Sequence, residues 1–206
     1  ARNYLLSSGA KPEYTFVVGS PMLEVLSKNN NFIESSSILE KLNLKEKEYI
    51  LLSAHREENI EADNAFIKLV TVLNSVAEDH QIPVIVSMHP RTQKKSAAMG
   101  AKFHPLVRLL KPLGFNDFVN LQMKAKAVLS DSGTINEESS IMNFPALNLR
   151  EAHERPEGME EAAVMMVGLE VKRVLQGLSI LATQKRGADR SEPHGIRQVA
   201  DYCMPN

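Results

Sequence analysis

Short runs of apolar residues alternate with longer amphipathic segments along most of the chain. The runs have the length and composition of buried strands and lie at residues 49–53, 83–88, 106–110, 127–130, 146–149 and 164–167. The longest segment between them repeats apolar residues at helical spacing from Phe66 to Ala77 and is expected to end near His80. Because helices and strands alternate and the strands are almost entirely apolar, the pattern predicts an α/β fold with a parallel, doubly wound sheet.

Capping residues and polar, turn-forming residues indicate where the remaining helices and loops lie. Ser20 and Pro21 have the residue types of a helix cap and a first turn, so a helix is expected to begin there. Further helices are expected at residues 36–42, 91–100, 116–125, 133–142, 157–162, 170–181 and 196–203. The first six residues have a helical pattern, Thr15 to Val18 are expected to form a strand, and the polar residues 183–195 are expected to form an exposed linker.

Composition and charge narrow the class of protein. The 206 residues include 24 Lys or Arg and 25 Asp or Glu, so a formal net charge of -1 provides no bulk attraction for nucleic acid or an anionic membrane. The single Cys203 excludes an intramolecular disulfide and suits a reducing cytosol. No apolar run has transmembrane length, and no grouping of residues has zinc-site spacing. We therefore expect a cytoplasmic protein without nucleic-acid, membrane, metal or cofactor partners.

Polar residues gather directly after three of the predicted strands, and the first such segment is Ser-Ala-His-Arg-Glu-Glu-Asn at residues 53–59. Ligands of open α/β sheets bind beyond the carboxyl ends of the strands, so these positions carry weight. His55 could act as an acid, a base or a charge stabiliser, because imidazole titrates near neutrality. A polar loop that leads into a helix cap would account for the same residues equally well.

The second polar segment is Ser-Asp-Ser-Gly-Thr-Ile-Asn-Glu-Glu at residues 130–138. Ser132, Gly133 and Thr134 would present backbone N–H groups at a helix N-terminus, which is a ready anion site. Glu138 lies about one turn further along and could accept two hydrogen bonds from a ribose diol. A capping box, in which Thr134 and the acidic residue three positions later cap the helix reciprocally, would account for the same residues. Neither the P-loop nor the Gly-x-Gly-x-x-Gly pattern is present.

The third polar segment is Arg-Glu-Ala-His-Glu-Arg-Pro-Glu at residues 150–157. Arg150 and Arg155 could clamp a diphosphate with paired hydrogen bonds, although an ion-paired surface loop would account for them as well. The three segments together indicate a nucleotide-diphosphate site: amides and arginines for the phosphates, Glu138 for the ribose and His55 for the chemistry.

The motifs, in this order and spacing, resemble the non-hydrolysing UDP-N-acetylglucosamine 2-epimerases. Residues 53–59 match the family's Thr-x-His-Arg-Arg-Glu-Asn motif, with Glu57 in place of its second Arg. Residues 130–138 match Thr-Asp-Ser-Gly-Gly-x-x-Glu-Glu, with Thr134 in place of its second Gly. Residues 153–157 match Thr-Glu-Arg-Pro-Glu, and residues 112–118 match Pro-Leu-x-Tyr/Phe-x-x-Phe.

The resemblance implies a set of residue roles. His55 corresponds to the catalytic histidine, which is thought to stabilise the departing UDP. The UDP-sugar would be bound by Ser132, Gly133, Thr134, Glu138, Arg155 and Phe118. Within that set, Phe118 would line the uridine side. Arg56 matches a position at which some members bind an allosteric UDP-sugar, and His89, at a strand end, is a second allosteric candidate.

The resemblance also implies an architecture and a reaction. The chain would be the C-terminal, Rossmann-like half of a two-domain GT-B enzyme, with residues 1–30 as a remnant of the N-terminal domain and linker. Residues 31–182 would bind UDP, and residues 183–206 would form a polar linker and a C-terminal helix. The expected enzyme is a homodimeric isomerase that epimerises C2 of UDP-N-acetylglucosamine, or of a 6-deoxy analogue, in capsule or O-antigen sugar synthesis.

The expected reaction eliminates UDP and adds it back, and the carboxylates that would handle the proton belong to the N-terminal domain in the family. The present chain offers no candidates for them, so we expect it to be inactive alone. Two alternatives remain: a GT-B glycosyltransferase donor domain and a non-catalytic UDP-sugar binding module.

Overall fold

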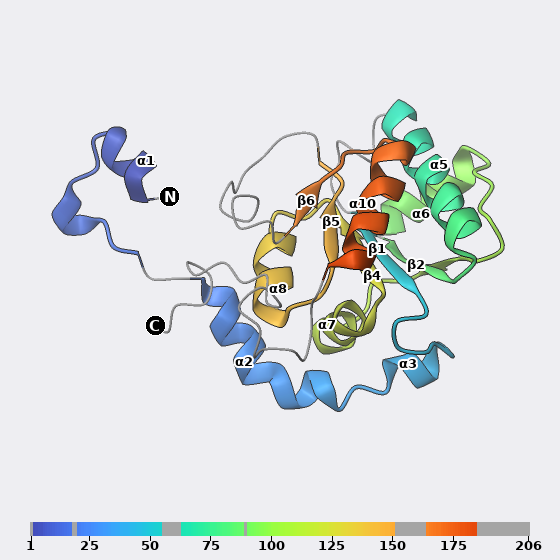
Figure 1. Ribbon diagram of the computed structural model, residues 1–206, viewed down its shortest axis with the longest axis horizontal. Coiled ribbons are helices and arrows are strands. Elements are labelled where there is room, and N and C mark those ends of the chain that lie inside the picture. The colour runs from blue at the N-terminus through green and yellow to red at the C-terminus, as the bar shows by residue number, and fades with distance from the viewer. Residues whose placement is uncertain (1, 18–19, 55–62, 89, 151–163, 185–206) are drawn as a thin grey trace.

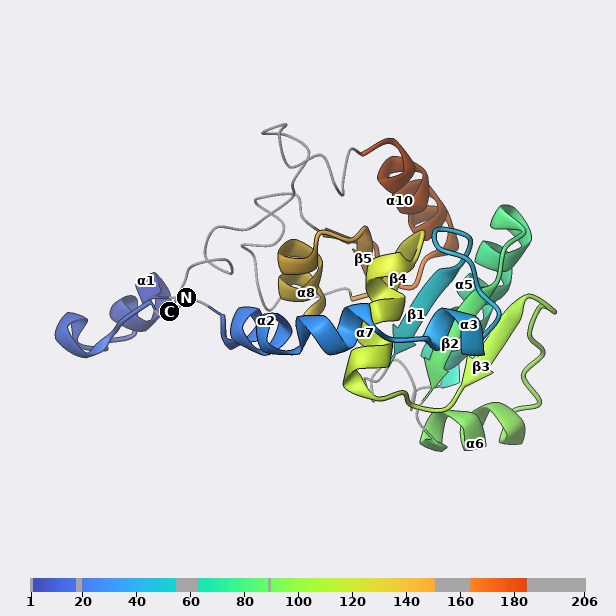
Figure 2. The ribbon, with the colours of Figure 1, turned by 90° about the horizontal axis from the view of Figure 1, so that it is seen from below.

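The computed structural model describes residues 2–17, 20–54, 63–88, 90–150 and 164–184. Within these ranges, parallel strands form a six-stranded sheet in the order β3-β2-β1-β4-β5-β6 (Figure 1, with β3 labelled in Figure 2). The strands are β1 (Ile50–Ala54), β2 (Val84–Met88), β3 (Val107–Leu110), β4 (Ala127–Ser130), β5 (Ala146–Asn148) and β6 (Met165–Met166). The order is that of a Rossmann-like doubly wound sheet, so the predicted fold is confirmed.

Alternate residues of the strands enter two separate cores, because successive side chains of a strand point to opposite faces. Leu52 and Val86 belong to the core that is covered by α5 (Asp63–His80) and α10 (Val171–Thr183). Leu51 and Ile85 belong to the opposite core, which is covered by α3 (Ile38–Lys41), α7 (Phe115–Lys124) and α8 (Ile135–Met142). The sheet is therefore a central layer between helices (Figures 1 and 2).

The N-terminal part of the chain lies to one side of the sheet (Figures 1 and 2). It contains α1 (Arg2–Ser7), the short 3-10 helix η1 (Pro12–Tyr14) and α2 (Pro21–Glu34). Ser20 caps α2 as predicted, because its Oγ accepts a hydrogen bond from the Met22 N–H at 3.1 Å. Leu26 and Ile33 of α2 pack with Val119 of α7, so α2 is joined to the helix layer beside the sheet.

The strand predicted over Thr15 to Val18 is wrong for its described residues. Thr15 to Val17 have no regular secondary structure, and the Phe16 side chain is 74% exposed. A strand exists only where a neighbour completes its hydrogen bonds, and this segment pairs with no strand in the described part of the chain. Its apolar residues therefore have the composition of a strand, but the segment lacks the backbone hydrogen bonds to a neighbouring strand that a strand requires.

The other helices agree with the pattern apart from small shifts at their ends. The segment expected at 91–100 forms α6 (Pro90–Ala98), and α10 extends two residues beyond the expected Leu181. The expected helices at 157–162 and 196–203 lie outside the described residues, as does the linker beyond residue 184.

Residues 47–49, just before β1, close the C-terminal end of α7. The Tyr49 hydroxyl donates to the Leu121 carbonyl at 2.6 Å. The Lys47 ammonium donates to the carbonyls of Met123 and Ala125, and its backbone N–H donates to the Lys124 carbonyl. Burial raises the pKa of Tyr49 and lowers the pKa of Lys47. Four carbonyls at the helix end thus obtain donors, and a cation lies at the negative end of the helix dipole.

Candidate nucleotide-binding site

The 130–134 segment lies where the strand order of the sheet reverses. The central strand β1 pairs with β2 on one side and with β4 on the other, and Ser53 lies opposite Ser130 in the register. The Asp131 N–H donates to the Ser53 carbonyl at 3.3 Å, which holds the two strand ends together. This switch point, beyond the carboxyl ends of the strands, is the place where doubly wound folds bind their ligands.

Hydroxyl groups shape the turn that follows β4. The Ser130 Oγ accepts a hydrogen bond from the Ser132 N–H at 3.1 Å, and the Ser132 Oγ accepts one from the Thr134 N–H at 3.2 Å. The hydroxyls of Ser132 and Thr134 also contact each other at 2.8 Å. The turn that leads into α8 is therefore held by its own side chains.

The capping-box interpretation is wrong. Thr134 is the N-cap residue of α8, yet its side chain makes no capping hydrogen bond. Its hydroxyl donates instead to Oε1 of Glu138 at 2.7 Å. Glu137, which would complete a capping box, accepts a buried hydrogen bond from the Ser20 hydroxyl. Both side chains are thus engaged in contacts that a purely local capping motif would not need.

Glu138 is half-buried and held from two sides. Thr134 donates to Oε1, and the Gln122 Nε2 of α7 donates to Oε2 at 2.6 Å. Sequence reasoning identified Glu138 and Thr134 but missed Gln122. The available signal in the sequence was a polar residue on an apolar stripe, because Gln122 lies one turn after Phe118. In the structure Gln122 is only 2% exposed.

Ser20 is a second residue that sequence reasoning did not connect to the site. Its hydroxyl caps α2 and also donates to Glu137 on α8, so it links the helix beside the sheet to the helix that carries Glu138. The sequence identified Ser20 only as a cap. Since 117 residues separate the partners, the sequence carries no local signal for this contact.

Phe118 lies on the same face of α7 as Gln122, one turn earlier. Its half-buried ring packs against the core that contains Leu51 and Val128. The structure thus brings Ser132, Gly133, Thr134 and Glu138 together in one turn and helix start, and places Phe118 on the adjacent helix. The role of Phe118 toward uridine stays a prediction.

The other predicted site residues lie outside the described residues. They are His55, Arg56, His89 and Arg155. Arg150 is described, and its N–H donates to the Asn148 side chain at 3.1 Å. Among the described residues, no group of three or more His, Cys, Asp or Glu could hold a metal ion. No described helix is both long and apolar enough to cross a membrane.

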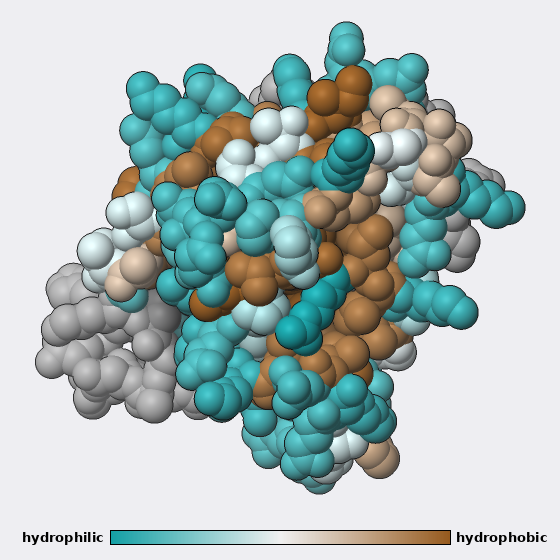
Figure 3. All heavy atoms as spheres, turned by 90° about the vertical axis from the view of Figure 1, so that its right-hand side faces the viewer, coloured by the Kyte–Doolittle hydropathy of each residue, from teal (hydrophilic) through white to brown (hydrophobic). Residues whose placement is uncertain are grey.

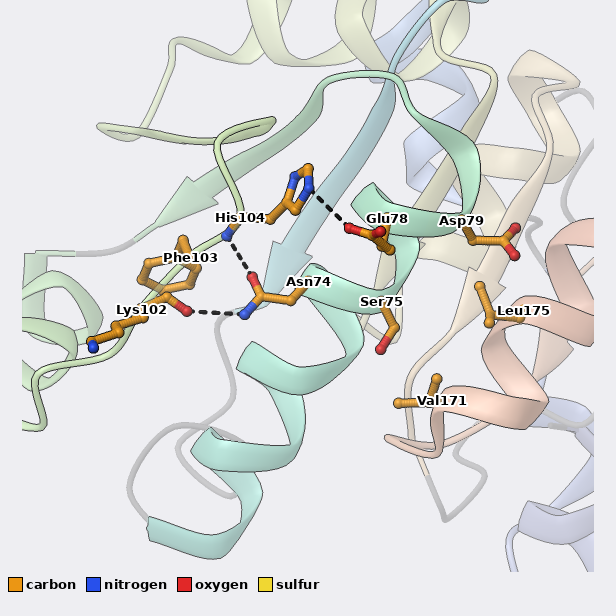
Figure 4. A pocket seen from close by; sticks show the side chains of 9 residues that line it. All are labelled: Asn74, Ser75, Glu78, Asp79, Lys102, Phe103, His104, Val171 and Leu175. Atoms are coloured by element: carbon orange, nitrogen blue, oxygen red, sulfur yellow. Dashed lines mark hydrogen bonds and ion pairs between the residues drawn. The ribbon is translucent and has the colours of Figure 1, made fainter.

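A separate open groove of about 660 Å³ includes none of residues 130–138 in its lining, which Figure 4 shows from close by. It is lined by the second half of α5, by residues 102–104 before β3, and by Val171 and Leu175 of α10. Asn74 bonds the Lys102 carbonyl and the His104 N–H, and His104 contacts Glu78 at 3.1 Å. The face that carries α5 and α6 also mixes apolar and polar surface (Figure 3). The contacts of Asn74 and Glu78 with residues 102–104 join α5 to the loop before β3, and they indicate that these polar side chains have a structural role.

Comparison with known proteins identifies the family. The chain is 30% identical over 183 residues to a UDP-N-acetylglucosamine 2-epimerase of Methanococcus maripaludis, covering 85% of this chain and 50% of the relative. It is 39% identical to the structure of that enzyme from Rickettsia bellii, covering 98% of this chain and 52% of that one, with a TM-score of 0.81.

A Methanocaldococcus jannaschii UDP-GlcNAc 2-epimerase, solved in complex with UDP-GlcNAc and UDP, is 28% identical with a TM-score of 0.81, covering 89% of this chain and 52% of that one. The fold is shared more widely, because an E. coli ADP-heptose heptosyltransferase superposes with a TM-score of 0.52 at 15% identity. The chain spans about half the length of the curated relatives it matches. The family model described as UDP-N-acetylglucosamine 2-epimerase matches residues 1–202, and the chain therefore belongs to this family.

Proposed function

We propose that this chain is the UDP-binding half of a UDP-N-acetylglucosamine 2-epimerase. The observation that carries the proposal is the position of residues 130–138, which form the turn and helix start at the switch point of the sheet. A helix N-terminus there suits a diphosphate, and a half-buried carboxylate one turn later suits a ribose diol. Relatives of the same family have been solved with UDP-GlcNAc or UDP bound, which supports this ligand class.

The reaction we propose inverts C2 through an elimination. A base removes the C2 proton, the C1–O bond breaks, and UDP departs with the bonding electrons to leave a 2-acetamidoglucal. Re-addition re-forms the C1–O bond and returns a proton to the other face of C2. The turn at Ser132 to Thr134, together with Arg155 and His55, would stabilise the charge that develops on the departing diphosphate.

The remaining parts of the proposal concern the whole protein. Residues 1–30 would belong to the N-terminal domain and linker, residues 31–182 would form the UDP-binding domain, and residues 183–206 would be a linker and terminal helix. The carboxylates that exchange the C2 proton would lie in the other half. We propose a cytoplasmic homodimer that supplies a sugar nucleotide for polysaccharide synthesis, acting on UDP-GlcNAc or a 6-deoxy relative, with Arg56 and His89 as candidate allosteric residues.

The test uses the protein that includes both halves, incubated in D2O with UDP-GlcNAc and separately with the 6-deoxy-L-talo analogue. Inversion at C2 with deuterium incorporation there is the expected result by NMR. Formation of a glycoside with an added acceptor would instead indicate a glycosyltransferase, and full activity of His55→Ala would remove that residue from the mechanism. The 206-residue chain alone should bind UDP weakly and show no turnover.

A further inference from the structure

We propose that Gln122 and Thr134 are positioning residues that hold the Glu138 carboxylate ready for a vicinal diol. This inference rests on the proposed function, since the diol is that of the UDP ribose. Gln122 is on α7, Glu138 is on α8, and Thr134 is in the turn before α8. The orientation of the Glu138 carboxylate then depends on the hydrogen bonds that Gln122 and Thr134 donate to it.

The hydrogen-bond inventory of Glu138 matches a diol. A carboxylate has about four acceptor sites, two on each oxygen. Thr134 occupies one site on Oε1 at 2.7 Å, and Gln122 occupies one on Oε2 at 2.6 Å. With respect to the described residues, one acceptor site therefore remains on each oxygen, and two adjacent hydroxyls can each donate to one of them. The two protein donors fix the plane in which those remaining sites lie.

The direction of each hydrogen bond follows from the carboxylate. Because it only accepts, the Thr134 hydroxyl must give its single proton to Glu138, and the Gln122 amide must present its NH2 group. The contact between the Ser132 and Thr134 hydroxyls must then carry the Ser132 proton. Consecutive hydrogen bonds thus lead from Ser132, in the turn that would hold the diphosphate, through Thr134 to the Glu138 carboxylate that would hold the ribose.

Gln122 is an unusual choice for a core position. The residue is 2% exposed, and its Oε1 is buried and has no hydrogen-bond partner among the described residues. An unsatisfied buried carbonyl opposes folding, so an apolar residue of similar shape would suit the packing better. The amide is explained by its Nε2, which bonds Glu138.

Asn120 on the same helix offers a matched control. It is 1% exposed, and its Nδ2 donates to the Ile33 carbonyl of α2. Its Oδ1 is also buried, with no hydrogen-bond partner in the part of the chain that the structure describes. Replacing Asn120 by Leu removes a buried amide from α7 without touching Glu138. Thr134→Ser is the conservative counterpart of Thr134→Ala, because serine keeps the hydroxyl that bonds the carboxylate.

The experiment measures the dissociation constants of UDP and of 2′,3′-dideoxy-UDP by calorimetry for the chain and its variants. The ratio of the two constants reports recognition of the diol. We expect the ratio to be about tenfold in the parent chain and to fall severalfold in Gln122→Met and Thr134→Ala. The ratio isolates the loss of diol recognition, because any change in diphosphate binding affects both nucleotides alike. Thr134→Ser and Asn120→Leu should keep the parent ratio.

The other outcomes overturn the positioning of Glu138, the recognition of the diol, or the proposed function. Equal weakening of both nucleotides in Gln122→Met and Thr134→Ala would mean a structural role and would refute positioning. Unchanged affinity for both nucleotides in both variants would refute it as well, and Thr134→Ala tests the idea even if Gln122→Met fails to fold. A parent chain that binds both nucleotides equally would refute diol recognition while UDP binding stands. A parent chain that binds neither nucleotide would refute the proposed function itself.

Discussion

The hydroxyl of Tyr49 supports the end of the helix that carries Gln122, and its removal by Tyr49→Phe tests this contact. Tyr49 is fully buried, and its hydroxyl donates to the Leu121 carbonyl in the last turn of α7 at 2.6 Å. Leu121 is also fully buried, so water cannot readily replace the lost donor. The substitution changes one oxygen atom and keeps the ring.

The expected cost follows from that geometry. A net hydrogen bond contributes about 1 kcal/mol, and a buried carbonyl left without a donor costs about 1–3 kcal/mol. We expect Tyr49→Phe to lower the free energy of unfolding by about 2 kcal/mol, the middle of that range. For a chain of this size the melting temperature should fall by roughly 4–8 °C, because each kcal/mol corresponds to about 2–4 °C.

The assay is chemical and thermal unfolding of both proteins followed by circular dichroism. Tyr14→Phe is the matched control, because Tyr14 is 77% exposed and the same atom is removed. We expect that control to stay within about 0.5 kcal/mol of the parent. Equal stability of Tyr49→Phe and Tyr14→Phe would refute the reasoning that the buried hydroxyl holds the end of α7.

The pH dependence provides a second, independent readout of Tyr49. Burial raises the pKa of Tyr49 in the folded protein above its ordinary value of about 10. The folded state then retains the phenolic proton that the unfolded chain loses, so the contribution is complete below about pH 10 and is lost as the pH rises above it. The difference in stability between the parent and Tyr49→Phe should therefore narrow above about pH 10.

Three further predictions concern other parts of the molecule. Leu52 is fully buried on the central strand β1. Leu52→Ala should therefore lower the free energy of unfolding, measured in urea, by about 2–5 kcal/mol. A change near zero would contradict the burial of both faces of the sheet. Gly177→Val should destabilise the packing of α10 on the sheet by about 1–3 kcal/mol, because a Cβ at Gly177 would lie 2.9 Å from Leu147 Cδ1; a variant as stable as the parent would show that the core yields there. Burial and the Lys126 charge lower the pKa of His80. The unfolded chain then binds a proton more readily than the folded protein, so stability should fall as the pH drops below about 6.5. The size of that fall should be smaller in His80→Gln, as measured by melting temperature against pH, and an identical profile would contradict the assignment.

Some of the candidate site follows from sequence because its residues are neighbours in the chain. Ser132, Thr134 and Glu138 fall within nine consecutive positions that begin at Ser130, where a predicted strand ends. A strand end followed by a helix start places them at the rim of an α/β sheet in any arrangement of the other elements. The partners on other elements could not be found in this way, because Gln122 lies on another helix and Ser20 is 117 residues away from Glu137.

The fold class follows from the amino-acid pattern alone, since the alternation of apolar strands and amphipathic helices leaves few ways to bury both faces of a parallel sheet. Tertiary structure decided whether a local pattern is realised. Thr15 to Val17 have the residue types of a strand, but no described strand pairs with them. Thr134 has the residue type of a capping box, but its hydroxyl donates to Glu138 instead. Periodicity records which side of an element is buried. The contacts made by that side depend on which other element packs against it, and only the folded chain settles that choice.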